Sequence, residues 1–178
     1  MLTATIDEDI ELRLLREENV EDLFELVDGD REYLRRWLPW VDGNATVEDT
    51  RVFILGCEGR RTSGIWYRGA LVGVIGFHAI DVVGGKVEIG YWLGSRCQGR
   101  GIMTRACRAM IDHAFAGLGM KRVEIHCAAE NERSRAIPER LGFVEEGTIR
   151  EGQQLHGRFV DVVVYGLLSP EWRETTPR

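Results

Sequence analysis

The chain has 178 residues, a net charge of −6 and 44% hydrophobic residues, which is the size and composition of one globular domain. No apolar run reaches the roughly 18 residues that a membrane-spanning helix needs, and the acidic N-terminal segment 1–11 is unlike a secretory signal. Nucleic-acid binders usually carry a basic excess, which this chain lacks. We therefore expect a single domain over residues 1–178, located in the cytoplasm, with no nucleic-acid or membrane partner.

The cysteines and histidines are scattered along the chain, without the close pairs that mark zinc sites or disulfide frameworks. We therefore expect no metal site, and free thiols of the kind found in a reducing compartment. The residues concerned are Cys57, Cys97, Cys107 and Cys127, and His78, His113, His126 and His156.

The first third of the chain shows one strand pattern and three helix patterns. Alternating apolar and polar residues predict a strand over 10–14. Asp30 is the expected N-cap of the second helix, and Pro39 is expected to end it. The predicted helices cover residues 17–27, 30–37 and 46–57.

The rest of the chain is richer in strand patterns, separated by turn residues and by two helices. Apolar residues spaced by three and four along the first of these helices predict one buried face. Pro138 should weaken the second helix, because proline removes a backbone donor. The predicted strands cover residues 64–68, 70–79, 86–93, 121–127, 143–150 and 158–168, and the predicted helices cover 101–115 and 131–141.

Segment 94–111 places a glycine-containing turn between a predicted strand and a predicted helix. The first turn of a helix has backbone N–H groups without intrahelical partners, which bind anions together with the helix dipole. Four arginines (Arg96, Arg100, Arg105 and Arg108) and no acidic residue lie here, so we expect a polyanion site. A Walker loop is absent, and Thr104 stands where a dinucleotide fingerprint needs its third glycine. An ordinary strand-to-helix turn is the alternative.

Two motifs in this order resemble the GCN5-related N-acetyltransferases. In the first, Gln98, Gly101 and Met103 match the family's Gln/Arg-x-x-Gly-x-Gly/Ala, with Met103 departing from the small residue. The second is Asn131-x-x-Ser134, followed by Leu-Gly-Phe. The resemblance extends over essentially the whole chain. It implies an α+β fold with a mixed, mostly antiparallel twisted sheet, flanked by helices and containing a splayed strand pair for the cofactor.

Segments 37–40 and 160–165 resemble the branch of this family that acetylates the N-termini of ribosomal proteins. The resemblance implies an enzyme that moves the acetyl group of acetyl-CoA to a primary amine by direct attack, with a protein N-terminus as the acceptor. A small-molecule amine (an antibiotic or a polyamine) is an alternative acceptor. An acyl-CoA-binding module without catalysis is a further alternative, and the valine-rich last strand leaves a homodimer open.

The same resemblance implies where acetyl-CoA, the only cofactor expected, would bind. Backbone groups of 91–93 would pair with the pantetheine arm as an added strand does, and N–H groups of 99–104 would hold the pyrophosphate. Asn131 would orient the arm, since an amide both donates and accepts. The implied cofactor-binding residues are Tyr91, Trp92, Leu93, Gln98, Gly99, Arg100, Gly101, Ile102, Met103, Thr104 and Asn131.

An α-amine has a pKa of about 8 and a lysine one of about 10.4, so deprotonation at pH 7 costs about 1.4 and about 5 kcal/mol respectively. Glu88 is the candidate catalytic base, and a salt-bridged strand glutamate is the alternative. Ser134 matches a catalytic family serine near the coenzyme sulfur, or else caps a helix. Gln153 stands where the branch often has a glutamate, so Glu88, Gln153 or water handles the proton. Trp37 and Trp40 would line the substrate cleft or form a buried corner.

Overall fold

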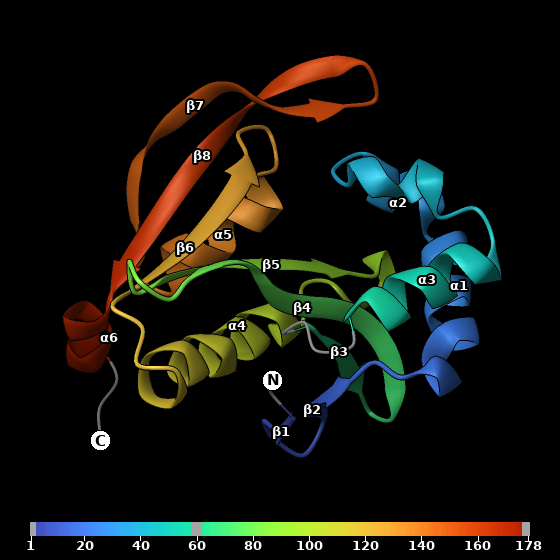
Figure 1. Cartoon of the computed structure of the whole chain (residues 1–178), viewed down its shortest axis with the longest axis horizontal. Coiled ribbons are helices and arrows are strands. Elements are labelled where there is room, and N and C mark those ends of the chain that lie inside the picture. Colours follow the sequence, from blue (N-terminus) through green and yellow to red (C-terminus); the bar gives the residue numbers. More distant parts are fainter. Residues whose placement is uncertain (1–2, 58–61, 176–178) are drawn as a thin grey trace. The chain divides into compact units, whose positions relative to one another are not determined.

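The structure is a computed structural model that describes residues 3–57 and 62–175 (Figure 1). Met1 and Leu2, the first residues of the acidic N-terminal segment, lie outside these residues. The last three residues of the predicted domain, 176–178, also lie outside them. The strands are β1 (Ala4–Thr5), β2 (Ile10–Leu14), β3 (Thr62–Tyr67), β4 (Ala70–Asp81), β5 (Lys86–Leu93), β6 (Arg122–Ala128), β7 (Val144–Leu155) and β8 (Arg158–Leu168). The α-helices are α1 (Val20–Gly29), α2 (Arg31–Arg35), α3 (Val47–Cys57), α4 (Ile102–Asp112), α5 (Glu132–Arg140) and α6 (Ser169–Thr175).

The described strands are hydrogen-bonded neighbours in the order β1-β2-β3-β4-β5-β6-β8-β7. β5 and β6 run parallel. β1, β2, β3 and β4 pair antiparallel in succession, and so do β6, β8 and β7. This mixed, mostly antiparallel sheet with its helices confirms the predicted α+β fold.

The chain divides into two compact units. The first contains the residues up to Gly76 together with Tyr91–Ala106, and the second contains Phe77–Gly90 together with the residues from Cys107 onward. Each unit is described by itself below, and the single domain over 1–178 stays a prediction.

In the first unit, α1 packs beside α3 (Figure 1). Val20, Leu23 and Val27 recur on one face of α1 at helical spacing, and all three are buried. Full burial of such a side chain contributes about 1.5–3 kcal/mol, so this face holds the helix in place. Two apolar clusters result, and Trp92 of β5 packs against both of them.

In the second unit, β7 and β8 form a long curved hairpin that continues into α6 (Figure 1). Helix α5 contacts β6 and β7. The buried face predicted for the helix over 101–115 is confirmed: Cys107 and Met110 of α4 and Ala114 of the turn that follows it are fully or almost fully buried, as is Met103, which belongs to the first unit.

Several predicted boundaries are wrong. The predictions missed β1 and α6, which are short, and ended β7 at residue 150, whereas it runs to Leu155 with two register shifts against β8. Helix α4 ends at Asp112 and is followed by a π-helical turn over His113–Gly117. Pro138 lies inside α5, buried, near the C-terminal end of the helix.

Candidate active site

The segment from β5 to α4 begins where β5 leaves its parallel partner. The register of β5 with β6 covers three pairs and ends at Glu88 opposite Glu124, so the remaining residues of β5, Ile89–Leu93, continue outside it. Gly94 N–H donates to the Val72 carbonyl at 2.8 Å. A side chain at Gly73 would start only 2.4 Å from the Trp92 carbonyl oxygen, so glycine is required for this close approach of backbones.

The turn itself combines open backbone with the start of a long helix. Gly99 and Gly101 both adopt left-handed φ angles, 73° and 70°, which favour glycine. No atom lies within 4 Å of a Cβ built at either glycine. The side chains of Ile102 and Met103 are buried, so these two residues offer only their backbone N–H groups to a ligand. The turn before α4 therefore has the open backbone geometry that an anion site at a helix N-terminus needs.

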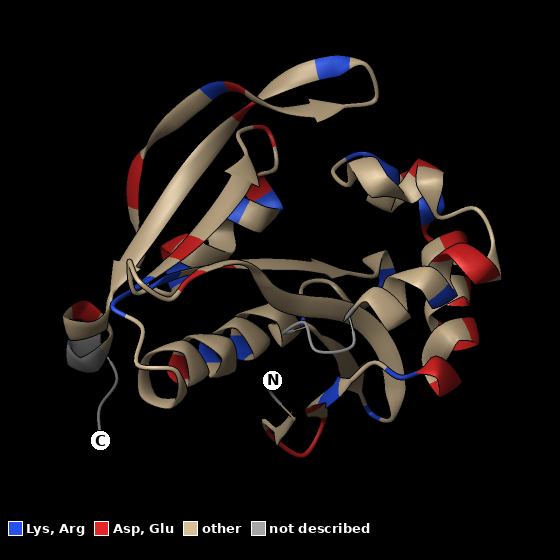
Figure 2. Ribbon diagram, in the orientation of Figure 1, with Lys and Arg blue, Asp and Glu red and all other residues tan. Residues whose placement is uncertain are grey.

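The predicted arginine cluster is partly neutralised. Arg105 forms an ion pair with Asp7 at 2.6 Å and donates to the Arg100 carbonyl at 3.1 Å. Arg100 lies over the Tyr67 ring, 5.9 Å from its centroid. In the second unit, Arg108 lies over Trp172 at 5.1 Å. Figure 2 shows the basic bands along α4, but Asp7 lowers the net charge that the sequence suggested.

Asp7 is held as a carboxylate. Partial burial opposes its ionisation, but hydrogen bonds from the Asp9 N–H and from Arg105 outweigh that effect, so the pKa of Asp7 lies below its ordinary value. Sequence reasoning missed Asp7 because it stands 98 residues from Arg105.

Asp30 is the N-cap residue of α2, as predicted, but its side chain makes no cap hydrogen bond to the helix. Its carboxylate instead accepts from the Ser95 hydroxyl at 2.6 Å and from the Ser95 N–H. Three residues on, the Tyr33 hydroxyl accepts from the Gln98 side-chain amide. The beginning of α2 therefore fixes the turn that leads to Gly99 and Gly101.

Trp40 is 39% exposed, so it does not belong to a buried corner. Its ring packs against Trp92 with centroids 5.9 Å apart and planes tilted by 52°. Trp37 is half-buried, whereas Pro39 begins a short 3-10 helix over Pro39–Gly43 rather than ending α2 directly. One of the two predicted cleft tryptophans thus contacts a predicted cofactor residue within the first unit.

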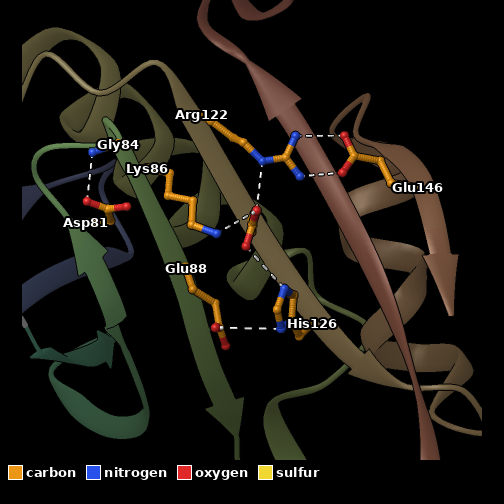
Figure 3. Close-up of polar contacts among 8 residues, drawn as sticks. Asp81, Gly84, Lys86, Glu88, Arg122, His126 and Glu146 are labelled. Carbon is orange, nitrogen blue, oxygen red and sulfur yellow. Dashed lines mark hydrogen bonds and ion pairs between the residues drawn. The ribbon is translucent and has the colours of Figure 1, made fainter. Parts of the chain in front are cut away.

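Glu88 lies in the second unit among charged and imidazole side chains of neighbouring strands (Figure 3). Its carboxylate is 3.6 Å from His126 Nδ1 and 4.0 Å from His78 Nδ1. His126 Nε2 is 3.3 Å from Glu124, in a contact that lacks hydrogen-bond geometry. Glu88 therefore lies beside two imidazoles, which form ion pairs with it only when they are protonated.

Asn131 and Ser134 lie together at the start of α5, also in the second unit. Asn131 is the N-cap, and its side-chain oxygen accepts from the Ser134 N–H at 3.2 Å. The interpretation of Ser134 as the cap is therefore wrong. The Ser134 hydroxyl is 3.2 Å from the buried Cys127 thiol.

Tyr165 is almost fully buried, and its hydroxyl accepts from Arg135 Nε and donates to Glu139, both at 2.9 Å. Burial in particular raises its pKa to about 12. The Tyr165 hydroxyl is therefore fully engaged by its neighbours in the second unit. Gln153 lies half-buried on β7 opposite Val160.

Among residues 3–57 and 62–175, no group of three or more metal-ligating side chains is arranged to hold an ion, and no helix is long and apolar enough to span a membrane. The predicted cofactor residues of β5 and the turn fall in the first unit, whereas Glu88, Asn131 and Ser134 fall in the second.

Comparison with known proteins gives concordant matches. A family model described as "Acetyltransferase (GNAT) domain" matches residues 9–144. The putative ribosomal N-acetyltransferase YdaF of Bacillus subtilis (strain 168) is 39% identical over 179 residues, covering 97% of this chain and 98% of that one. The ribosomal-protein-serine acetyltransferase of Escherichia coli (strain K12) is 31% identical over 169 residues, covering 92% and 94%.

A solved structure of RimL, a ribosomal L7/L12 alpha-N-protein acetyltransferase in complex with coenzyme A, matches with a TM-score of 0.90 at 28% identity. The match covers 96% of this chain and 99% of that chain.

Proposed function

The chain belongs to the GNAT family of acetyltransferases, and we propose that it transfers the acetyl group of acetyl-CoA to the α-amino group of a protein N-terminus, with a ribosomal protein as the natural acceptor. The observation that carries this proposal is the full-length similarity to two proteins named for ribosomal acetylation. The resemblance of segments 37–40 and 160–165 to that branch supports the same acceptor.

The turn before α4 supports a place for the pyrophosphate of acetyl-CoA. Its two left-handed glycines leave open space beside the backbone. The N–H groups of the first turn give the N-terminus of α4 a partial positive charge, which favours a bound anion. In this proposal the backbone of Tyr91–Leu93 pairs with the pantetheine arm, because β5 continues past its register with β6. Asn131 and Gln98 complete the cofactor set.

An α-amine needs only a weak base, because its deprotonation at pH 7 costs about 1.4 kcal/mol. Glu88 takes the proton of the ammonium group, and the freed nitrogen attacks the thioester carbonyl. The attack forms the C–N bond and a tetrahedral intermediate, whose collapse breaks the C–S bond. The second proton that the nitrogen loses passes to the leaving thiolate, which accepts a hydrogen bond from the Ser134 hydroxyl, and coenzyme A leaves as the free thiol. The N–H of Leu93 stabilises the charge that develops on the carbonyl oxygen. Direct attack needs no acyl-enzyme, so no cysteine has a role in it.

The acceptor is tested by thiol release with matched amines. The substrates are a peptide with a free serine or alanine N-terminus, the same peptide with a blocked N-terminus, and spermidine. We expect kcat/KM for the free N-terminus to exceed the other two by at least about tenfold, a difference of about 1.4 kcal/mol. A preference for spermidine would move the acceptor to small polyamines and contradict the proposal.

A further inference from the structure

Four side chains form a row across three strands of the second unit. His78 comes from β4, Glu88 from β5, and His126 and Glu124 from β6. Glu88 and Glu124 are directly paired in the parallel register, and His126 follows Glu124 by two residues, so it shares its face of the strand. Histidine and glutamate therefore alternate along the row, and Figure 3 shows Glu88 and His126 side by side on neighbouring strands.

The two glutamates of this row have different partners. Glu124 accepts from Arg122 Nε at 2.8 Å and lies 3.5 Å from Lys86 Nζ, both through one oxygen. Burial opposes its ionisation, but the Arg122 hydrogen bond and the Lys86 charge outweigh it and lower the pKa of Glu124. Arg122 is itself held by a two-pronged ion pair with Glu146 of β7. Glu124 is therefore a fixed anion.

Glu88 has no ion pair with lysine or arginine among the described residues, and its partners are the two imidazoles. A permanent cation would stabilise its charged form and make it a weaker base. An imidazole N–H can orient a carboxylate without that permanent charge. The second oxygen of Glu124 lies 3.3 Å from His126 Nε2, and Nδ1 of the same ring lies 3.6 Å from the Glu88 carboxylate.

We propose that His126 is a positioning residue that orients the Glu88 carboxylate for proton removal. The inference rests on the proposed function, because it takes Glu88 to be the base. The side chain of His126 is 27% exposed and that of Glu88 25% exposed, so their contact is largely shielded from water. His78, 67% exposed, closes the outer end of the row.

The test compares two substitutions of similar size at position 126. His126→Leu removes both ring nitrogens, whereas His126→Asn keeps an N–H donor on the atom that replaces Nδ1. Misplacement of a reacting group by about 1 Å can cost up to about 100-fold in rate. We expect His126→Leu to lower kcat by about 10- to 100-fold with the KM for acetyl-CoA unchanged, and His126→Asn to recover most of that loss. His156→Asn, on the β7–β8 turn, is the matched histidine control.

A double-mutant cycle separates positioning from a general structural role. If His126 acts through Glu88, His126→Leu has no further effect on kcat in a Glu88→Gln background. An equal loss in both backgrounds, or no loss in either, would overturn the inference. Full activity of Glu88→Gln alone would instead remove Glu88 as the base, which is a failure of the proposed function rather than of the His126 geometry.

Should His126→Leu fail to fold, the same cycle is run with His126→Ala, which also removes both ring nitrogens. We expect His126→Ala to lower kcat in the wild-type background and to cause no further loss in the Glu88→Gln background. An equal loss in both backgrounds refutes the positioning role.

Discussion

Replacing Asp30 with alanine should loosen the turn that leads to the cofactor loop. The carboxylate accepts two hydrogen bonds from Ser95, one from the hydroxyl at 2.6 Å and one from the N–H. A hydrogen bond to a charged group contributes about 1.5–3 kcal/mol, and the lower value applies here because Asp30 is only half-buried. Two such bonds give a loss of about 3 kcal/mol, which corresponds to roughly 6–12 °C in Tm for a chain of this size.

Circular dichroism melting with and without acetyl-CoA, together with titration calorimetry, measures both consequences. Asp28→Ala is the matched control, because Asp28 forms only an exposed ion pair with Arg31 at 3.0 Å, and such pairs contribute about 1 kcal/mol or less. We also expect Asp30→Ala to weaken acetyl-CoA binding, since part of the loop order must then be gained on binding. If Asp30→Ala has the same melting temperature as Asp28→Ala and binds acetyl-CoA as tightly as the wild type, the reasoning is refuted.

Three further predictions concern the loop, an acidic residue and the buried tyrosine. Gly101→Ala should lower the free energy of unfolding by about 1 kcal/mol, because residue 101 has a left-handed φ, and should weaken coenzyme A binding in calorimetry. Gly119→Ala is the control, because Gly119 also has a positive φ and open space beside it, and it should lower stability alone. Equal binding of coenzyme A by both variants would contradict the loop assignment. Asp7 has a lowered pKa, so its contribution to stability is present above the ordinary value near 3.8 and is lost as the pH falls through the lower folded value. Asp7→Asn should therefore reduce the urea midpoint at pH 7, and the reduction should shrink as the pH falls below 3.8; a reduction that does not change with pH would be inconsistent with this. Tyr165 has a raised pKa of about 12, so its contribution is full below pH 10 and lost between about pH 10 and 12; Tyr165→Phe should remove the last tyrosinate to appear at 295 nm, and an unchanged titration would show that another tyrosine titrates last.

The elements and the two motifs were predictable because their signals are local. The spacing of apolar residues in α1 and α4 predicts the buried face of each helix. The glycines that precede α4 predict where this helix begins. Asn131 and Ser134 are three residues apart, so one motif places both at the start of a helix.

The contacts that hold the candidate site were not predictable, because they join distant residues. Ser95 lies 65 residues from Asp30, and only the folded chain shows that the carboxylate of this N-cap residue accepts from Ser95 rather than from the N–H groups of α2. The partnership of Glu88 and His126 depends on the parallel register of β5 and β6, which no periodicity reveals. The greater length of β7 was missed because its side chains are almost all exposed and its pairing is interrupted, with Glu151 at a left-handed φ of 52°.

The account is tested most directly by one competition within a single acceptor. A peptide that carries both a free α-amine and an internal lysine is incubated with acetyl-CoA and the enzyme at pH 7, and the modified nitrogen is located by fragmentation mass spectrometry. The α-amine costs about 3 kcal/mol less to deprotonate than the lysine, and the account predicts acetylation at the N-terminus with the lysine unmodified. Acetylation of the lysine in preference to the N-terminus would contradict it.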